Sequence, residues 1–215
     1  MRILQASAMT LLVFLSQTDV RSQEPAAKEK PAASAKNTPP QAPGVKKTQA
    51  KKAQAKKVQA QKTRITPTQA NVSYGDHPRQ VLDFWQAKSE GPTPVVFHIH
   101  GGGWMAGDKA NVAGLERYLN AGISVVSINY RYVSQAYDAD IKPPVKAPLQ
   151  DAARALQFVR SKAKEWNLAK DRIAATGGSA GACSSLWLAF HGDMAEPGSD
   201  DPIARESTRL LCAAV

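Results

Sequence analysis

The chain has 215 residues, of which 43% are hydrophobic and 21% charged, and its formal net charge at pH 7 is +10. Almost all of this charge lies in residues 23–64, which hold eleven basic and two acidic residues, whereas residues 65–215 hold fifteen of each sign. The part expected to fold therefore has no basic bias, which argues against a nucleic-acid partner.

Residues 1–22 have the pattern of a secretory signal peptide. Arg2 supplies the positive start, and residues 6–15 form an apolar run that is too short to span a bilayer, which needs about 20 residues. Val20-Arg21-Ser22 precedes a tolerable cleavage point. We predict a secreted or periplasmic protein; the alternative is a disordered start with a chance apolar cluster.

Residues 23–64 are rich in Lys, Ala, Gln and Pro and contain no aromatic residue. Such a composition buries too little apolar surface to offset the entropy of ordering, so we predict a disordered linker. Three five-residue repeats beginning at Lys46 advance about 140° each round a helix, which spreads the Lys pairs over all faces. The linker is then either a solvated spacer or a weak binder of anionic surfaces.

From residue 65 the pattern becomes globular. Short alternating or apolar runs predict strands, and a 3.6-residue period predicts helices. The expected strands are residues 71–74, 81–85, 94–99, 123–128, 173–176 and 209–215, and the expected helices are 112–119, 148–166 and the segment from Ser179 to Phe190. Residues 130–142 read as a polar loop. Alternation of strands with helices predicts a layered α/β fold.

Gly177-Gly178-Ser179-Ala180-Gly181 lies between an expected strand and an expected helix. This is the context of a nucleophile elbow, in which a sharp turn presents the Ser hydroxyl above the sheet. The turn predicts a strained backbone at Ser179, which costs about 1–3 kcal/mol. Otherwise Ser179 would be a helix N-cap.

A second glycine run, Gly101-Gly102-Gly103-Trp104, follows the strand expected at residues 94–99. With these two motifs the sequence resembles the α/β-hydrolase family, in its secreted esterase and lipase branch with an HGGG-W loop and a G-G-S-A-G elbow. The resemblance implies a three-layer α/β-hydrolase fold with a mostly parallel sheet. It covers roughly residues 70–215, and we expect residues 65–215 to form a partial domain equivalent to the N-terminal part of that fold.

The same resemblance implies a serine hydrolase that cleaves small-molecule carboxylic esters through an acyl-enzyme. Ser179 would be the nucleophile, and the N–H groups of Gly102, Gly103 and Ala180 would form the oxyanion hole. It implies no cofactor and no metal.

His98 and His100 share one face of their strand, but no third residue with suitable spacing completes a zinc site. We expect His100 to bond the glycine loop instead, and Trp104 to line the core or a pocket. Cys183 and Cys212 are expected to be buried free thiols rather than a disulfide.

In this family the catalytic Ser, acid and His follow one another in that order along the chain, but after Ser179 no suitable acid and His are found. After Ser179 the one remaining histidine is His191, about 18 Å along the same expected helix. The following acids, Asp193, Glu196, Asp200 and Asp201, come before the next strand. We therefore expect a C-terminally truncated hydrolase whose acid and His lie beyond residue 215. The alternative is a noncatalytic exported binding protein or an inactive fragment.

The composition of residues 23–64 generates a direct test. A chain that begins at Ile65 should unfold in urea at the same midpoint as the mature chain, because the linker is expected to bury nothing. A lower midpoint after trimming would contradict this expectation.

Overall fold

The computed structural model describes residues 65–215. The signal peptide predicted at 1–22 and the linker predicted at 23–64 lie outside the described residues. Within the described range, no helix is both long and apolar enough to cross a membrane.

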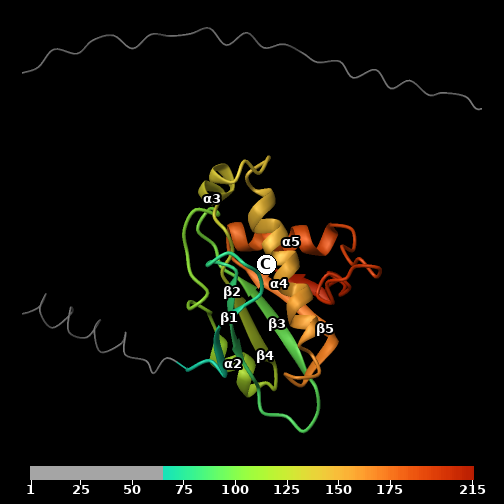
Figure 1. Ribbon diagram of the computed structural model, residues 1–215. Coiled ribbons are helices and arrows are strands. Elements are labelled where there is room, and N and C mark those ends of the chain that lie inside the picture. Colours follow the sequence, from blue (N-terminus) through green and yellow to red (C-terminus); the bar gives the residue numbers. More distant parts are fainter. Residues whose placement is uncertain (1–64) are drawn as a thin grey trace, which may run out of the picture. The chain divides into compact units, whose positions relative to one another are not determined.

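A six-stranded mixed sheet forms the centre of this region (Figure 1). Its order is β1-β2-β4-β3-β5-β6. The strands span Gln69–Ser73, Val81–Trp85, Thr93–Ile99, Ser124–Ile128, Leu168–Gly177 and Cys212–Ala214 for β1 to β6 respectively. β1, β2 and β4 pair antiparallel, whereas β4, β3, β5 and β6 pair parallel.

The parallel centre of the sheet aligns the ends of three strands. Ile99 of β3 is the register partner of both Ile128 in β4 and Gly177 in β5. Because parallel strands all end at one edge, the loops that follow β3, β4 and β5 emerge side by side. Both sequence motifs lie in these loops.

Helices cover both faces of the sheet, which gives the three layers expected. α4 (Lys146–Ser161) and α5 (Ala180–Phe190) belong to the main core, where Val95, Phe97 and Ile99 of β3 also lie. The opposite face carries a smaller cluster, in which Val96 contacts the region of α2 (Leu115–Asn120). The predicted fold class is therefore confirmed.

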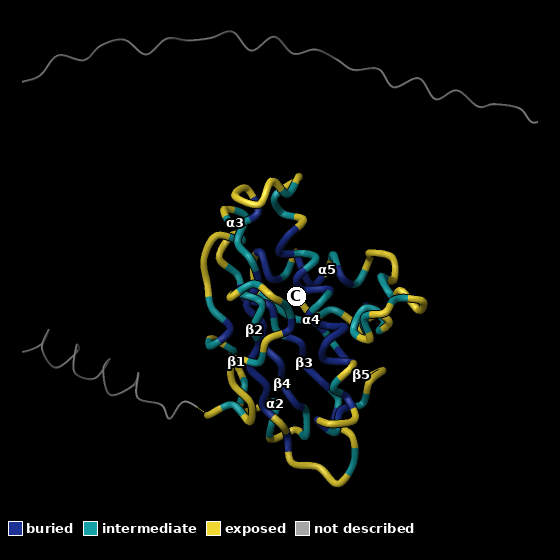
Figure 2. Tube along the Cα trace, viewed as in Figure 1, coloured by how far each residue is buried: buried dark blue, intermediate teal, exposed yellow. Residues whose placement is uncertain are grey.

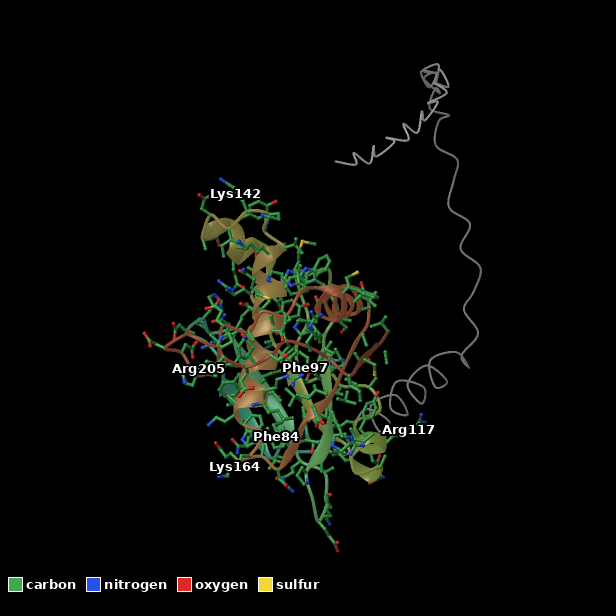
Figure 3. All side chains as sticks on the ribbon, turned by 90° about the vertical axis from the view of Figure 1, so that its right-hand side faces the viewer. Phe84, Phe97, Arg117, Lys142, Lys164 and Arg205 are labelled. Atoms are coloured by element: carbon green, nitrogen blue, oxygen red, sulfur yellow. The ribbon has the colours of Figure 1, made fainter. Side chains whose placement is uncertain are left out.

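The strands at the centre of the sheet are almost wholly buried (Figure 2). Phe84 and Phe97 point into the interior, whereas the labelled basic side chains lie at the periphery (Figure 3). Phe84 also stacks on Trp166, with ring centroids 4.6 Å apart. Burying each such aromatic side chain contributes about 1.5–3 kcal/mol.

Several predicted boundaries are wrong, each for a local reason. The helix expected at 148–166 begins at Lys146 and ends at Ser161, although Trp166 remains buried through its stacking on Phe84. The strand expected at 173–176 extends over Leu168–Gly177, and the one expected at 209–215 contracts to Cys212–Ala214. Propensity within a short window does not register these tertiary pairings.

Two further expectations need correction. The stretch expected as a polar loop contains α3 (Val133–Asp138), whose N-terminus is closed by Gln135 accepting a hydrogen bond from the backbone of Tyr132. Cys183 and Cys212 are free thiols, as expected, but both are exposed. α5 presents Cys183 outward, and β6 forms the edge of the sheet.

His98, in the middle of the sheet, makes stability depend on pH. Burial, reinforced by His100, lowers the pKa of His98 to about 4, and its Nδ1 lies 3.1 Å from the Ser127 hydroxyl. The unfolded chain takes up a proton below about pH 6.5, whereas the folded chain resists it until about pH 4. The free energy of unfolding should therefore fall as pH falls through this window, by up to about 3 kcal/mol.

Urea unfolding of the wild type and of His98→Gln between pH 7 and pH 4 checks this. We expect a smaller loss of stability in the variant, which does not titrate, with the remaining loss due to His100. An identical pH dependence in both proteins would contradict the assignment.

Candidate active site

Ser179 occupies the turn between β5 and α5 with backbone angles φ 55° and ψ −121°. A positive φ is sparsely populated for residues other than glycine and costs about 1–3 kcal/mol. Ser179 is the N-cap residue of α5 by position, but its side chain makes no capping hydrogen bond to the helix. The residue is exposed, and the expected strained serine at the top of the sheet is observed.

The glycines on either side of Ser179 allow the turn to approach β3. A Cβ on either Gly177 or Gly181 would collide with the carbonyl oxygen of Ile99. For Gly181 the added carbon would also lie 2.9 Å from the carbonyl carbon of Ile99 and 3.0 Å from that of His100. Only glycine lets the start of α5 lie this close to the end of β3.

The glycine run after β3 lies directly beside the elbow. A Cβ placed on Gly101 would stand 2.7 Å from the carbonyl oxygen of Gly178 and 3.5 Å from Cβ of Ser179. The two motifs, separated by almost eighty residues of sequence, therefore form one site.

The loop curls because three of its glycines adopt positive φ: 109° at Gly102, 61° at Gly103 and 111° at Gly107. The carbonyl of Gly102 accepts hydrogen bonds from the N–H groups of Met105 and Ala106, both at 3.0 Å. The glycines of the run carry no side chains of their own that could obstruct their N–H groups.

The N–H groups of Gly102, Gly103 and Ala180 donate to no protein atom among the described residues. The first N–H groups of any helix lack an intrahelical acceptor, and Ala180 opens α5. These three unsatisfied donors lie on the two loops that meet beside Ser179, and such donors suit a developing oxyanion. The helix N-terminus adds a favourable partial charge.

His100 braces the base of the loop, as expected. Its Nδ1–H donates to the carbonyl of Gly101 at 2.7 Å, and its ring stacks on Tyr130 with centroids 4.3 Å apart. Burial lowers the pKa of His100, so the ring is neutral at pH 7. Burial raises the pKa of Tyr130, whose hydroxyl stays protonated and donates to the carbonyl of His100 at 2.8 Å.

Asn129 and Tyr132, which sequence reasoning did not single out, hold the far end of the loop. Asn129 Oδ1 accepts from the N–H of Lys109 at 2.8 Å, and its Nδ2 donates to Asp108 at 3.1 Å. The hydroxyl of Tyr132 donates to the carbonyl of Gly107 at 2.7 Å. Their position could have indicated this role, because they follow β4, whose end lies beside the end of β3.

No histidine among residues 65–215 bonds to the hydroxyl of Ser179. His77 lies in the turn before β2, His98 bonds to Ser127, and His191 is exposed after α5 with its ring against Trp187. The acidic residues that follow α5 have other partners. Asp193 accepts hydrogen bonds from Thr208 and Ser207 in the loop before β6, and Asp201 forms an ion pair with Arg154.

Within the described range, no group of three or more His, Cys, Asp or Glu side chains could hold a metal ion. A hollow of about 1050 Å³ lies between β1, β2 and α2, on another part of the domain. None of Ser179, Gly102, Gly103 and Ala180 lines it.

Comparison with known proteins agrees with this geometry. The family model described as BD-FAE matches residues 82–208, which is more than half of the chain. The chain belongs to the BD-FAE family. This is a family of α/β-hydrolases, so the resemblance drawn from the two glycine motifs is confirmed at the level of the family.

Two curated relatives are esterases by name. The chain is 32% identical over 142 residues to a probable isoprenylcysteine alpha-carbonyl methylesterase of Arabidopsis thaliana, ICMEL1, covering 65% of this chain and 28% of that protein. It is 34% identical over 126 residues to the probable carboxylic ester hydrolase LipM of Mycobacterium tuberculosis, covering 56% and 28%.

Among solved structures, the chain resembles an acetyl ester-xyloside bifunctional hydrolase from Caldicellulosiruptor lactoaceticus. The TM-score is 0.58 at 25% identity, and the match covers 69% of this chain and 57% of that one. A truncated carbohydrate esterase from gut microbiota gives 0.56 at 25% identity, over 69% and 56%. The chain thus spans less than a third of these curated relatives and a little over half of these solved chains.

The tight approach of α5 to β3 can be tested by Gly181→Ala. Alanine normally favours a helix by up to about 1 kcal/mol over glycine. Here the collision of the added Cβ with the carbonyl of Ile99 should outweigh this preference, so the substitution should lower the free energy of unfolding by about 1–3 kcal/mol. Urea unfolding gives the difference.

Gly178→Ala is the matched control, because a Cβ on Gly178 would meet nothing within 4 Å. Its stability should change by less than about 0.5 kcal/mol. A stable Gly181→Ala protein would contradict the packing described.

Proposed function

We propose that the protein is a carboxylic ester hydrolase that uses Ser179 as its nucleophile. One observation carries the proposal: a strained, exposed serine at the start of α5 lies against a glycine loop in which the N–H groups of Gly102 and Gly103 have no partner among the described residues. The names of the relatives, methylesterase and carboxylic ester hydrolase among them, support the reaction class.

In the proposed reaction, the Ser179 hydroxyl attacks the ester carbonyl as a base takes its proton, which gives a tetrahedral oxyanion. The N–H groups of Gly102, Gly103 and Ala180 stabilise that charge, each contributing about 2.7–4 kcal/mol in comparable sites. Collapse then expels the alcohol, which takes up the proton, and leaves an acyl-enzyme. Water attacks this ester and releases the acid and free Ser179.

No described residue is placed to take the proton of the Ser179 hydroxyl, because no histidine within 65–215 bonds to Ser179. A serine hydroxyl without a neighbouring base is a weak nucleophile. We therefore propose that turnover needs a histidine, oriented by an acid, that reaches Ser179. For the 215-residue chain we propose at most slow acylation supported by the oxyanion hole.

The setting of this activity is also proposed from sequence alone. Residues 1–22 read as an export signal and 23–64 as a basic spacer, so the esterase would act outside the cytoplasm. Its substrate would be a small ester that reaches the exposed Ser179.

Hydrolysis of p-nitrophenyl acetate by the full product of the gene and by its Ser179→Ala variant tests the proposal. We expect the variant to lose at least about 10³-fold in kcat/KM, because the loss of a nucleophile in such sites removes most of the catalysis. The 215-residue chain should show at most a slow stoichiometric burst.

Equal rates for the wild type and Ser179→Ala would refute the nucleophile. Steady turnover by the 215-residue chain that depends on Ser179 would show that a base exists among its own residues, and would overturn the proposal that this chain acylates at most slowly. Ser185→Ala controls for damage to α5, since Ser185 is buried on the same helix and bonds only to Gly181.

A further inference from the structure

Trp104 and Ser184 form a hydrogen-bonded link between the glycine loop and α5. The indole Nε1–H of Trp104 donates to Oγ of Ser184 at 3.0 Å. The same hydroxyl donates to the carbonyl of Ala180 at 2.9 Å. Two successive hydrogen bonds therefore connect the indole of Trp104, which follows the glycine run, to Ala180, the first residue of α5.

Both ends of this link adjoin a group to which the proposed function gives a role. Trp104 directly follows Gly102 and Gly103, and Ala180 directly follows Ser179. The N–H groups of Gly103 and Gly102 therefore lie one and two residues before Trp104, and the N–H of Ala180 belongs to the residue that accepts the bond from Ser184. No other side-chain hydrogen bond joins residues 101–107 to α5 in the part of the chain that the structure describes.

Trp104 is held from two sides. Its carbonyl accepts a hydrogen bond at 2.9 Å from the N–H of Val133, at the start of α3, while its ring packs against the main core. Its φ of 56° is strained for a residue with a side chain, so the surrounding contacts must hold it there. Trp104 is thus bonded to two different helices, through its indole to α5 and through its carbonyl to α3.

The hydroxyl of Ser184 has no other evident role in the fold. It is 1% exposed, and an alanine would fill the same helical position without burying a hydroxyl. A buried serine that only bonds its own helix gives little to stability. The hydroxyl of Ser184 differs from that of Ser185 in receiving a donor from outside the helix.

We propose that Trp104 and Ser184 are positioning residues that fix the spacing between the two sets of oxyanion donors, those of the glycine loop and that of Ala180. Neither residue touches the reacting atoms. This inference rests on the proposed function, because it assigns a task to those donors.

The test compares Trp104→Phe, Ser184→Ala and their double variant in the full product of the gene. Phenylalanine keeps an aromatic ring and removes the indole N–H; alanine removes the hydroxyl. We expect each single change to lower the acylation rate constant for p-nitrophenyl acetate about tenfold, a fraction of the 10²–10³ that a lost donor costs. KM should stay within about twofold.

The two single effects should not multiply, because both changes break one bond. The double variant should therefore acylate about as slowly as the slower single variant. Ser185→Ala is the matched control: Ser185 is also buried and bonds the carbonyl four residues back, at 2.8 Å, but has no contact with the loop. It should acylate within about twofold of the wild type.

A second readout does not need activity. In the 215-residue chain the amides of Met105, Ala106 and Val133 are bonded in or beside the loop. Their hydrogen exchange should become faster in Trp104→Phe and Ser184→Ala and stay unchanged in Ser185→Ala.

Three results would overturn the inference: equal effects of Ser184→Ala and Ser185→Ala on acylation, multiplying effects of the two single variants, or faster exchange without slower acylation. Failure of the proposed function is seen separately, as wild-type activity in Ser179→Ala. In that case the exchange experiment still reports whether the bond holds the loop.

Discussion

The site depends on one steric constraint, the approach of the end of β3 to the start of α5 at a distance that no Cβ would allow. Gly177 and Gly181 both lie against the carbonyl of Ile99, and Gly101 lies against Gly178. This contact brings two loops together that are far apart in sequence. It lies next to the positive φ of Ser179, a strained conformation that persists only where the surrounding structure holds it.

Further contacts hold the glycine run in one conformation beside this close approach. β4 lies between β2 and β3, so the residues that follow it emerge beside the glycine run. Tyr130 holds the base of the run and Tyr132 its far end, while Trp104 ties its middle to Ser184. Two neighbouring segments, the residues after β4 and α5, thus hold a loop whose own glycines contribute no side-chain contact. Such preorganisation is what electrostatic stabilisation of an oxyanion requires.

The sequence was sufficient for the order of the strands, the layers and the pairing of the two motifs, because hydrophobic period and glycine spacing are local signals. It failed where long-range packing decides: α3 inside an apparent polar loop, the end of α4 and the exposed thiols. The strain at Ser179 was predictable from the turn. The braces from Asn129, Tyr130 and Tyr132 were not, since their role follows from sheet order rather than from any motif.

The central claim is that Ser179 and the unpaired N–H groups of Gly102, Gly103 and Ala180 converge on one tetrahedral centre. A crystal structure of the full product of the gene with an aryl boronic acid tests it most directly, because a serine boronate mimics the tetrahedral intermediate. The account predicts a covalent bond from Ser179 Oγ to boron, with one boronate oxygen about 2.7–3.1 Å from these N–H groups. Boron bound elsewhere, or a boronate on Ser179 whose oxygens face only solvent, would contradict it.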